Sequence, residues 1–120
     1  MESPKMYIFI NSSLNMTNGK MISQACHITH QIVDELVNDK YETYPPSENI
    51  MTYMKWNLNC TKIILKGTQE ELVELLKLPG ARGFYDSGNT TQGTENCLTV
   101  VGFLPCAKLE GTDINKFKLL

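Results

Sequence analysis

The chain has 120 residues and a mass of 13.6 kDa, which fits one domain spanning residues 1–120 with a core of its own. Its hydrophobic fraction of 42% and mean hydropathy of −0.22 exclude a disordered chain. The net charge of −2 and the pI of about 5.6 exclude a strongly basic, nonspecific nucleic-acid binder. No apolar run approaches the ~20 residues of a membrane helix, and the polar start lacks the pattern of a signal peptide. We therefore expect a cytoplasmic protein without a membrane partner.

The four cysteines are widely spaced along the chain, and no two of them form a C-x-x-C pair. This spacing argues against a zinc ribbon and against a thioredoxin-like redox motif. In a reducing cytosol we expect free thiols that act as small apolar groups or as bystanders. The four are Cys26, Cys60, Cys97 and Cys106.

In the first half of the chain, one strand is followed by two helices. The β-prone run Tyr7–Ile10 predicts a strand, and the polar segment Asn11–Gly19 predicts a loop with turn chemistry. Apolar residues then recur every three to four positions, which predicts a helix from about Lys20 to about Asp39. After the Pro45–Pro46 break, Ser47 is positioned to cap a second helix that runs to about Leu58.

The second half alternates strands with a helix. Lys62–Lys66 is predicted to be a buried strand, and Thr68 with Glu71 has the form of a capping box at the start of a helix that ends before Pro79. The remaining predictions, in chain order, are a strand at Gly83–Asp86, a polar loop at Ser87–Asn96, a strand at Cys97–Phe103 and a short helical turn capped near Thr112 or Asp113.

This alternation predicts the α/β class. We expect a single-domain three-layer α/β/α architecture, with a mixed, roughly four-stranded sheet flanked by helices. In open α/β sheets, sites form beyond the carboxyl ends of strands. The segments Asn11–Lys20 and Asp86–Thr91 leave strands with suitable polar side chains, and they are the candidate site.

Both segments carry residues at recognisable spacing. The first combines Leu14, Met16, Gly19 and Lys20 with Gln24 and His27 on the following helix, and the second reads Asp86-Ser87-Gly88-Asn89-Thr90. Together they resemble the two motifs of the peptidyl-tRNA hydrolase 2 family, the archaeal and eukaryotic type of this enzyme. The resemblance covers nearly the whole chain, and the final Lys118-Leu119-Leu120 also fits it.

The resemblance implies a metal-independent hydrolase without a cofactor that cleaves the ester between peptide and tRNA in peptidyl-tRNA, with a possible homodimer. It assigns the catalytic roles to Lys20, Asp86 and Thr90, and substrate binding to Gly19, Gln24, His27 and Gly88. Ester hydrolysis needs a positioned water, a base and a donor for the developing oxyanion. A carboxylate, an ammonium and a hydroxyl are suitable groups for these tasks. Whether Asp86 acts as the base or orients the water stays open at this stage.

Three positions depart from the family pattern. Ser13 stands where the first motif has an acid, Asn18 replaces the earlier of two lysines, and Asn89 replaces a frequent arginine. The loss of positive charge favours an alternative reading, in which the chain is a non-catalytic module that binds RNA or a protein on the same fold. The presence of Lys20, Asp86 and Thr90 together favours the enzyme.

Histidines and aromatic residues offer weaker hypotheses. His27 and His30 are three residues apart on the predicted helix and should face roughly the same way, but no further ligand is placed by spacing, so we expect no metal site. Tyr53 and Trp56 are suited to stacking on a base, although packing against the sheet explains them as well.

Overall fold

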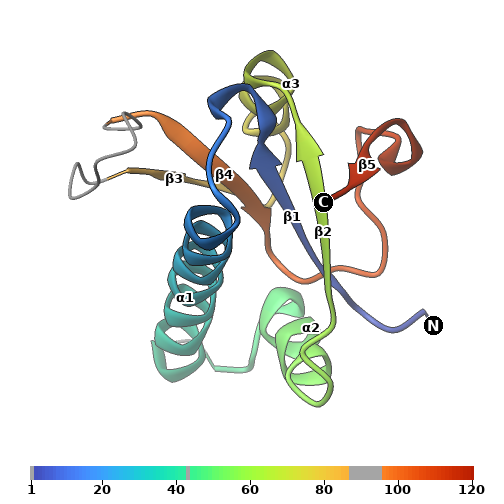
Figure 1. Cartoon of the computed structure of the whole chain (residues 1–120). Helices are drawn as coiled ribbons and strands as arrows, with labels where there is room; N and C mark the ends of the chain where they lie inside the picture. The colour runs from blue at the N-terminus through green and yellow to red at the C-terminus, as the bar shows by residue number, and fades with distance from the viewer. Residues whose placement is uncertain (1, 43, 87–95) are drawn as a thin grey trace.

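The computed structural model of the chain describes residues 2–42, 44–86 and 96–120. Its strands form one mixed five-stranded sheet in the order β3-β4-β1-β2-β5, with β3 and β5 at the two edges (Figure 1). The α/β prediction is confirmed, with five strands rather than about four. The elements are β1 (Met6–Asn11), the 3₁₀ turn η1 (Ser12–Leu14), α1 (Asn18–Glu42), α2 (Glu48–Trp56), β2 (Lys62–Gly67), α3 (Gln69–Leu75), β3 (Ala81–Tyr85), β4 (Leu98–Phe103), the 3₁₀ turn η2 (Ile114–Lys116) and β5 (Lys118–Leu119).

The strand directions bring three carboxyl ends to one side of the sheet. β1 and β2 are parallel, and β4 is antiparallel to both β1 and β3. It follows that β3 runs in the same direction as β1 and β2. The ends Asn11, Gly67 and Tyr85 therefore lie along one edge, which we call the carboxyl edge. This arrangement confirms that the two candidate segments leave the sheet on the same side.

Helices cover both faces of the sheet, and alternate residues of β1 separate the two cores. Met6, Ile8 and Ile10 face α1 and α2, whereas Tyr7 and Phe9 face the side of α3. The α1-side core also contains Ile28, Ile32 and Leu36 from α1 and Ile50, Tyr53 and Trp56 from α2. The α3-side core also contains Leu65, Leu72, Leu75, Leu98, Val101, Phe103, Leu109 and Phe117. The three-layer prediction is confirmed.

Local signals located the helix starts well. Ser47 accepts a hydrogen bond from the Ile50 N–H as the N-cap of α2, and Thr68 with Glu71 forms a reciprocal capping box at α3. Packing of Tyr53 and Trp56 in the α1-side core is also confirmed.

All four cysteines are free, and Cys26 and Cys60 are exposed. Within the described ranges, no helix is both long and apolar enough to cross a membrane.

Two predictions about strands need correction. β2 is only half-buried, because Lys62 and Lys66 alternate with residues that enter the cores. The end of the chain forms the short strand β5 against β2, which composition alone did not indicate. The predicted turn before β5 is present, and Asp113 caps it by accepting a hydrogen bond from the Asn115 N–H. Most of the predicted polar loop, residues 87–95, lies outside the described residues.

A two-pronged ion pair ties α1 to the edge strand β3. Arg82 Nε donates to Glu35 Oε1 at 2.8 Å, and a terminal guanidinium nitrogen donates to Glu35 Oε2 at 2.7 Å. This bonding lowers the pKa of the Glu35 carboxyl, chiefly through the hydrogen bonds from Arg82 and against the smaller effect of burial. The pair fixes where the helix lies over β3.

We predict that Glu35→Gln lowers stability at neutral pH but not in acid. A lowered folded-state pKa stabilises the protein above the unfolded pKa, and this stabilisation is lost as the pH falls through the folded value. At pH 7 the loss should be about 1 kcal/mol or less, because the pair is partly exposed. Urea unfolding of both proteins at pH 7 and near pH 3 checks this. An equal difference at both pH values would contradict it.

Candidate active site

A buried ion pair joins the first turn of α1 to the end of β3. Lys20 Nζ lies 3.0 Å from Asp86 Oδ2, and the two side chains are only 11% and 5% exposed. Opposite charges withdrawn from water attract each other more strongly than surface charges do. The structure thus brings together two of the three residues with predicted catalytic roles, at the carboxyl edge.

The start of α1 positions Lys20. The Thr17 hydroxyl accepts a hydrogen bond from the Lys20 N–H at 3.2 Å, and the Thr17 carbonyl accepts from the Met21 N–H at 3.0 Å. Thr17 therefore caps the helix, and Lys20 is its third residue. A cation in the first turn of a helix is disfavoured by the helix dipole. Asp86 supplies the negative charge that compensates for this position.

Asp86 is held by the strand pair that it follows. Its N–H donates to the Cys97 carbonyl at 3.1 Å, and its own carbonyl accepts from the Asn96 N–H at 3.1 Å. These bonds extend the pairing of β3 with β4 beyond the strands themselves. The backbone of Asp86 is therefore anchored on the sheet, and its side chain points to α1, where Lys20 lies.

A β-bulge in β4 places a further polar group beside this pair. Phe84 is opposite Val100, but Tyr85 is opposite Leu98, so Thr99 is an extra residue on β4. Leu98 packs in the α3-side core and Val100 in the α1-side core. Because Thr99 also reaches α1, two consecutive side chains face the helix, which simple alternation does not predict.

Thr99 and Gln24 form a buried polar contact one turn along α1 from Lys20. The Thr99 hydroxyl lies 2.5 Å from Gln24 Oε1 and 3.2 Å from the Phe84 carbonyl. Thr99 is fully buried and Gln24 is 2% exposed. The sequence analysis did not predict this role for Thr99, because the direction of its side chain depends on the bulge. The contact fixes α1 against β3 and β4 next to the ion pair.

The loop between β1 and α1 is clamped by a buried amide. Asn11 Nδ2 donates to the Leu98 carbonyl at 2.8 Å and to Gln69 Oε1 at 2.6 Å, and its Oδ1 accepts from the Ser13 N–H at 2.9 Å. The Ser13 hydroxyl in turn accepts from the Gln69 N–H at 2.9 Å. These bonds fix the segment that leads to Thr17 and Lys20. The sequence analysis placed Asn11 in the loop but did not predict its clamping role, because only the fold brings its partners together.

Comparison with known protein families gives a match over nearly the whole chain. The family described as Peptidyl-tRNA hydrolase PTH2 matches residues 4–120. The chain belongs to this family. Membership implies peptidyl-tRNA hydrolase activity, which is the hydrolysis of an ester. No curated protein sequence matches the chain in a direct comparison.

The predicted substrate-binding residues of this peptidyl-tRNA hydrolase differ in their surroundings. Gly19 is exposed in the first turn of α1, with no atom within 4 Å of an added Cβ. His27 is exposed, with its ring centroid 5.0 Å from that of Phe84 and its Nε2 3.2 Å from the Ser23 hydroxyl. Gln24 is buried, which favours a positioning role over direct contact with substrate. A substrate contact by any of the three stays a prediction.

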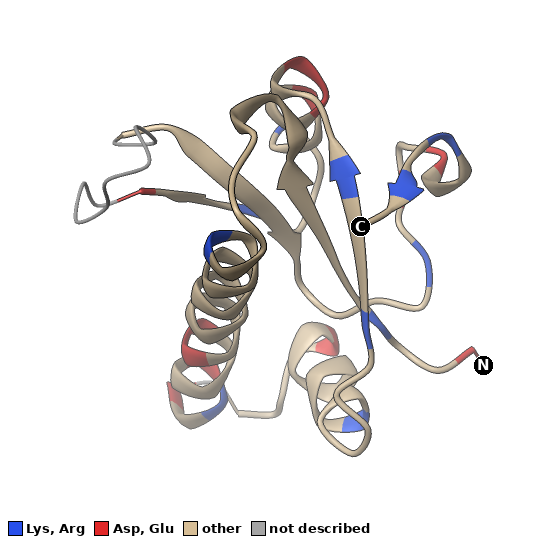
Figure 2. Cartoon of the chain, viewed as in Figure 1, with Lys and Arg blue, Asp and Glu red and all other residues tan. Residues whose placement is uncertain are grey.

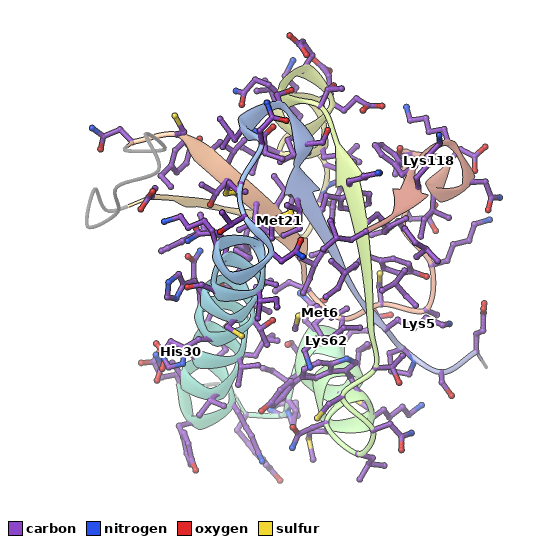
Figure 3. The ribbon with its side chains drawn as sticks, in the orientation of Figure 1. Lys5, Met6, Met21, His30, Lys62 and Lys118 are labelled. Carbon is purple, nitrogen blue, oxygen red and sulfur yellow. The ribbon has the colours of Figure 1, made fainter. Side chains whose placement is uncertain are left out.

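The two histidines do not share a site. His27 packs on Phe84 of β3, whereas His30 lines a groove of about 530 Å³ between α1 and β2 (Figure 3). His27 and His30 are both exposed, but their neighbours come from different strands, because His27 contacts β3 and the groove beside His30 includes Lys62 and Ile64 of β2. Within residues 2–42, 44–86 and 96–120, no three His, Cys, Asp or Glu side chains are arranged to hold a metal ion.

Part of the second motif falls outside the described residues. Gly88, Asn89 and Thr90 belong to that segment, so their predicted roles stay predictions. The two departures in the first motif are described. Ser13 makes a hydrogen bond to the start of α3 that an acid in its place could also accept. Asn18 is exposed as the first residue of α1.

We predict that Thr99→Val destabilises the fold, whereas Thr99→Ser does not. Valine keeps the shape but leaves the buried Gln24 oxygen without the hydroxyl donor, which costs about 1–3 kcal/mol. Serine retains that donor. Urea unfolding at pH 7 measures the difference, and equal stability of the two variants would show that the contact does not hold α1 in place.

Proposed function

We propose that the chain hydrolyses peptidyl-tRNA with Lys20, Asp86 and Thr90 as its catalytic residues. The family supplies the reaction, and the buried Lys20–Asp86 ion pair at the carboxyl edge is the observation that supports these roles. Thr90 and Gly88 are included because their spacing from Asp86 fits the second motif. Gly19 and His27 would contact the substrate around this pair, and Gln24 would hold it in place.

In this proposal Asp86 is the base and Lys20 stabilises the developing negative charge. An ammonium has three N–H donors, and the pair with Asp86 uses one of them, which leaves donors for a substrate oxygen. Asp86 takes a proton from a water molecule as that water attacks the ester carbonyl. Lys20, with the Thr90 hydroxyl, donates to the carbonyl oxygen, which becomes negatively charged.

The second step completes the hydrolysis. The tetrahedral intermediate collapses, the bond between the carbonyl carbon and the ribose oxygen breaks, and Asp86 returns its proton to that oxygen. The products are a peptide with a free carboxyl group and tRNA with a free ribose hydroxyl. Every proton is accounted for by the water, so the scheme needs no redox partner and no cofactor.

We predict that Asp86→Asn and Lys20→Ala each lower kcat for peptide release by about 100-fold or more. Both variants remove a group that acts on the reacting atoms. Release of labelled peptide from purified peptidyl-tRNA measures the effect, with and without a chelator. Asp34→Asn and Lys40→Ala, which change exposed charges elsewhere on α1, are the matched controls and should retain full activity.

Three outcomes separate the alternatives. Activity that survives the chelator and is lost in both variants supports the metal-independent scheme. Activity that the chelator abolishes contradicts metal independence. No turnover by the unmodified protein at high concentration would overturn the enzyme and favour a non-catalytic module that binds RNA on the same fold.

We further infer that the protein forms a homodimer and acts in the cytoplasm. The family resemblance supports both statements, and an exposed apolar stripe supports the first. Met51, Met54 and Leu58, on α2 and the turn after it, are 56%, 46% and 82% exposed. The buried face of α2 is the one with Ile50, Tyr53 and Trp56, so the stripe lies on the exposed side. A two-fold contact through α2 would cover the stripe.

We predict a molar mass near twice 13.6 kDa in light scattering, and a mass near that of one chain for the Met54→Lys/Leu58→Lys variant. A lysine in the centre of an apolar contact has to be desolvated, which opposes association. Glu48→Lys, at the start of the same helix, is the control. One-chain mass for the unmodified protein at high concentration would contradict the dimer.

A further inference from the structure

Two lysines face each other across strands β2 and β5 without a counter-charge. Lys66 and Lys118 are register partners in this antiparallel pair, and both are exposed. Like charges directly opposite each other in a sheet are destabilising. Among the residues that the structure describes, neither lysine forms an ion pair, so their charges are left for an external anion.

These lysines lie on the same side of the sheet and at the same edge as the ion pair. Lys66 is two residues after Ile64, which packs against the α1-side core, so Lys66 also lies on the α1 side. It precedes Gly67 at the carboxyl edge. Neighbouring strands are ~4.8 Å apart, and β2 and β5 are the third and fourth strands from β3 in the sheet. Lys66 and Lys118 are therefore roughly 14 and 19 Å from β3, the strand that Asp86 follows.

The start of α1 lies on this side of the sheet, between β3 and β5. Its first turn holds no acidic residue, and Asn18 and Gly19 are exposed there. The N-terminus of a helix of 25 residues attracts phosphate through its free N–H groups and its dipole. The exposed acids of α1 are near its other end (Figure 2). On the α1 side of the carboxyl edge, the start of α1, Lys66 and Lys118 thus all favour an anion, whereas two acids of this edge, Glu70 and Glu71, belong to α3 on the opposite face of the sheet.

We propose that Lys66 and Lys118 form a second anchor for the tRNA, which binds backbone phosphates away from the reacting 3′ end. This inference rests on the proposed function. A tRNA is a polyanion, and each phosphate that a lysine neutralises adds affinity by releasing counterions. Lys118 lies on the edge strand β5, across the molecule from α1 in Figure 3. Nucleic acid bound at Lys20 would reach it by crossing the start of α1.

Lys62, on the same face of β2, is not part of this anchor. Its ammonium lies 5.4 Å from the centroid of the Trp56 ring, which engages it in a cation–π contact at the other end of the strand. The anchor is therefore limited to the two opposed lysines, and it can be removed without touching the catalytic pair.

The test compares a whole substrate with a truncated one. Lys66→Gln/Lys118→Gln should raise KM for peptidyl-tRNA about 10- to 30-fold near 150 mM salt and leave kcat unchanged, because two phosphate contacts are lost. A second substrate carries the same peptide on a short oligonucleotide with only the 3′ end of the tRNA. For this substrate, the variant and the unmodified protein should have the same kcat and KM. The slope of log affinity for tRNA against log salt should become shallower by about 2.

Two controls make the result specific. The variant Lys40→Gln/Lys77→Gln removes the same amount of charge, from the last turn of α1 and from the turn after α3. It should raise KM for peptidyl-tRNA far less than Lys66→Gln/Lys118→Gln does. Thermal unfolding shows whether the test variant is folded. It should be at least as stable as the unmodified protein, because the repulsion between the opposed lysines is gone.

Several outcomes would overturn the anchor. These are an unchanged KM, an equal rise in KM for the control pair, or an equal rise for the short substrate. Failure of the proposed function is recognised separately, since the unmodified protein would then release no peptide from either substrate. Even so, fluorescence anisotropy with uncharged tRNA would still measure whether Lys66→Gln/Lys118→Gln weakens binding, and no weakening would reject the anchor on its own.

Discussion

The ion pair between Lys20 and Asp86 is the constraint on which the rest of the structure depends. Two charges that are almost fully withdrawn from water are tolerated only when their geometry is maintained. Each neighbouring feature contributes to that geometry. Thr17 caps the helix that carries Lys20, and the bonds of Asp86 to Asn96 and Cys97 fix the strand end. The bulge at Thr99 lets its hydroxyl bond to Gln24 of the same helix. Farther along α1, Glu35 and Arg82 secure the same helix to the same strand.

The pair also shows how two segments that are far apart in the sequence meet at one place in a small fold. Because β1 and β3 run in the same direction, the loop that leads to Lys20 and the residue that follows β3 emerge at one edge. β4 lies between these two strands and contributes Thr99 to the space under the helix. The two departures of the first motif leave the ion pair in place. Ser13 still bonds to the start of α3, and Asn18 lies at the surface.

Sequence reasoning predicted what local rules determine. The caps at Ser47 and Thr68, the long helix after Gly19 and the position of Asp86 after a strand all follow from short-range chemistry. What depends on pairing between distant segments was not predicted. The bulge at Thr99 reflects the register of β3 with β4, and the charge opposition of Lys66 and Lys118 reflects the addition of β5 to the sheet. The buried amide of Asn11 likewise acquires its meaning from Leu98 and Gln69, which are far from it in sequence.

The central claim is that Lys20 and Asp86 act as one unit, and a double-mutant cycle tests it most directly. The measurement is kcat/KM for peptidyl-tRNA in the unmodified protein, in Lys20→Ala, in Asp86→Ala and in the variant with both changes. Groups that act as a unit give strongly non-additive effects. We expect the double variant to be about as slow as the slower single variant. If the two losses multiply instead, the residues act independently, and the ion pair is not the centre of the catalytic site.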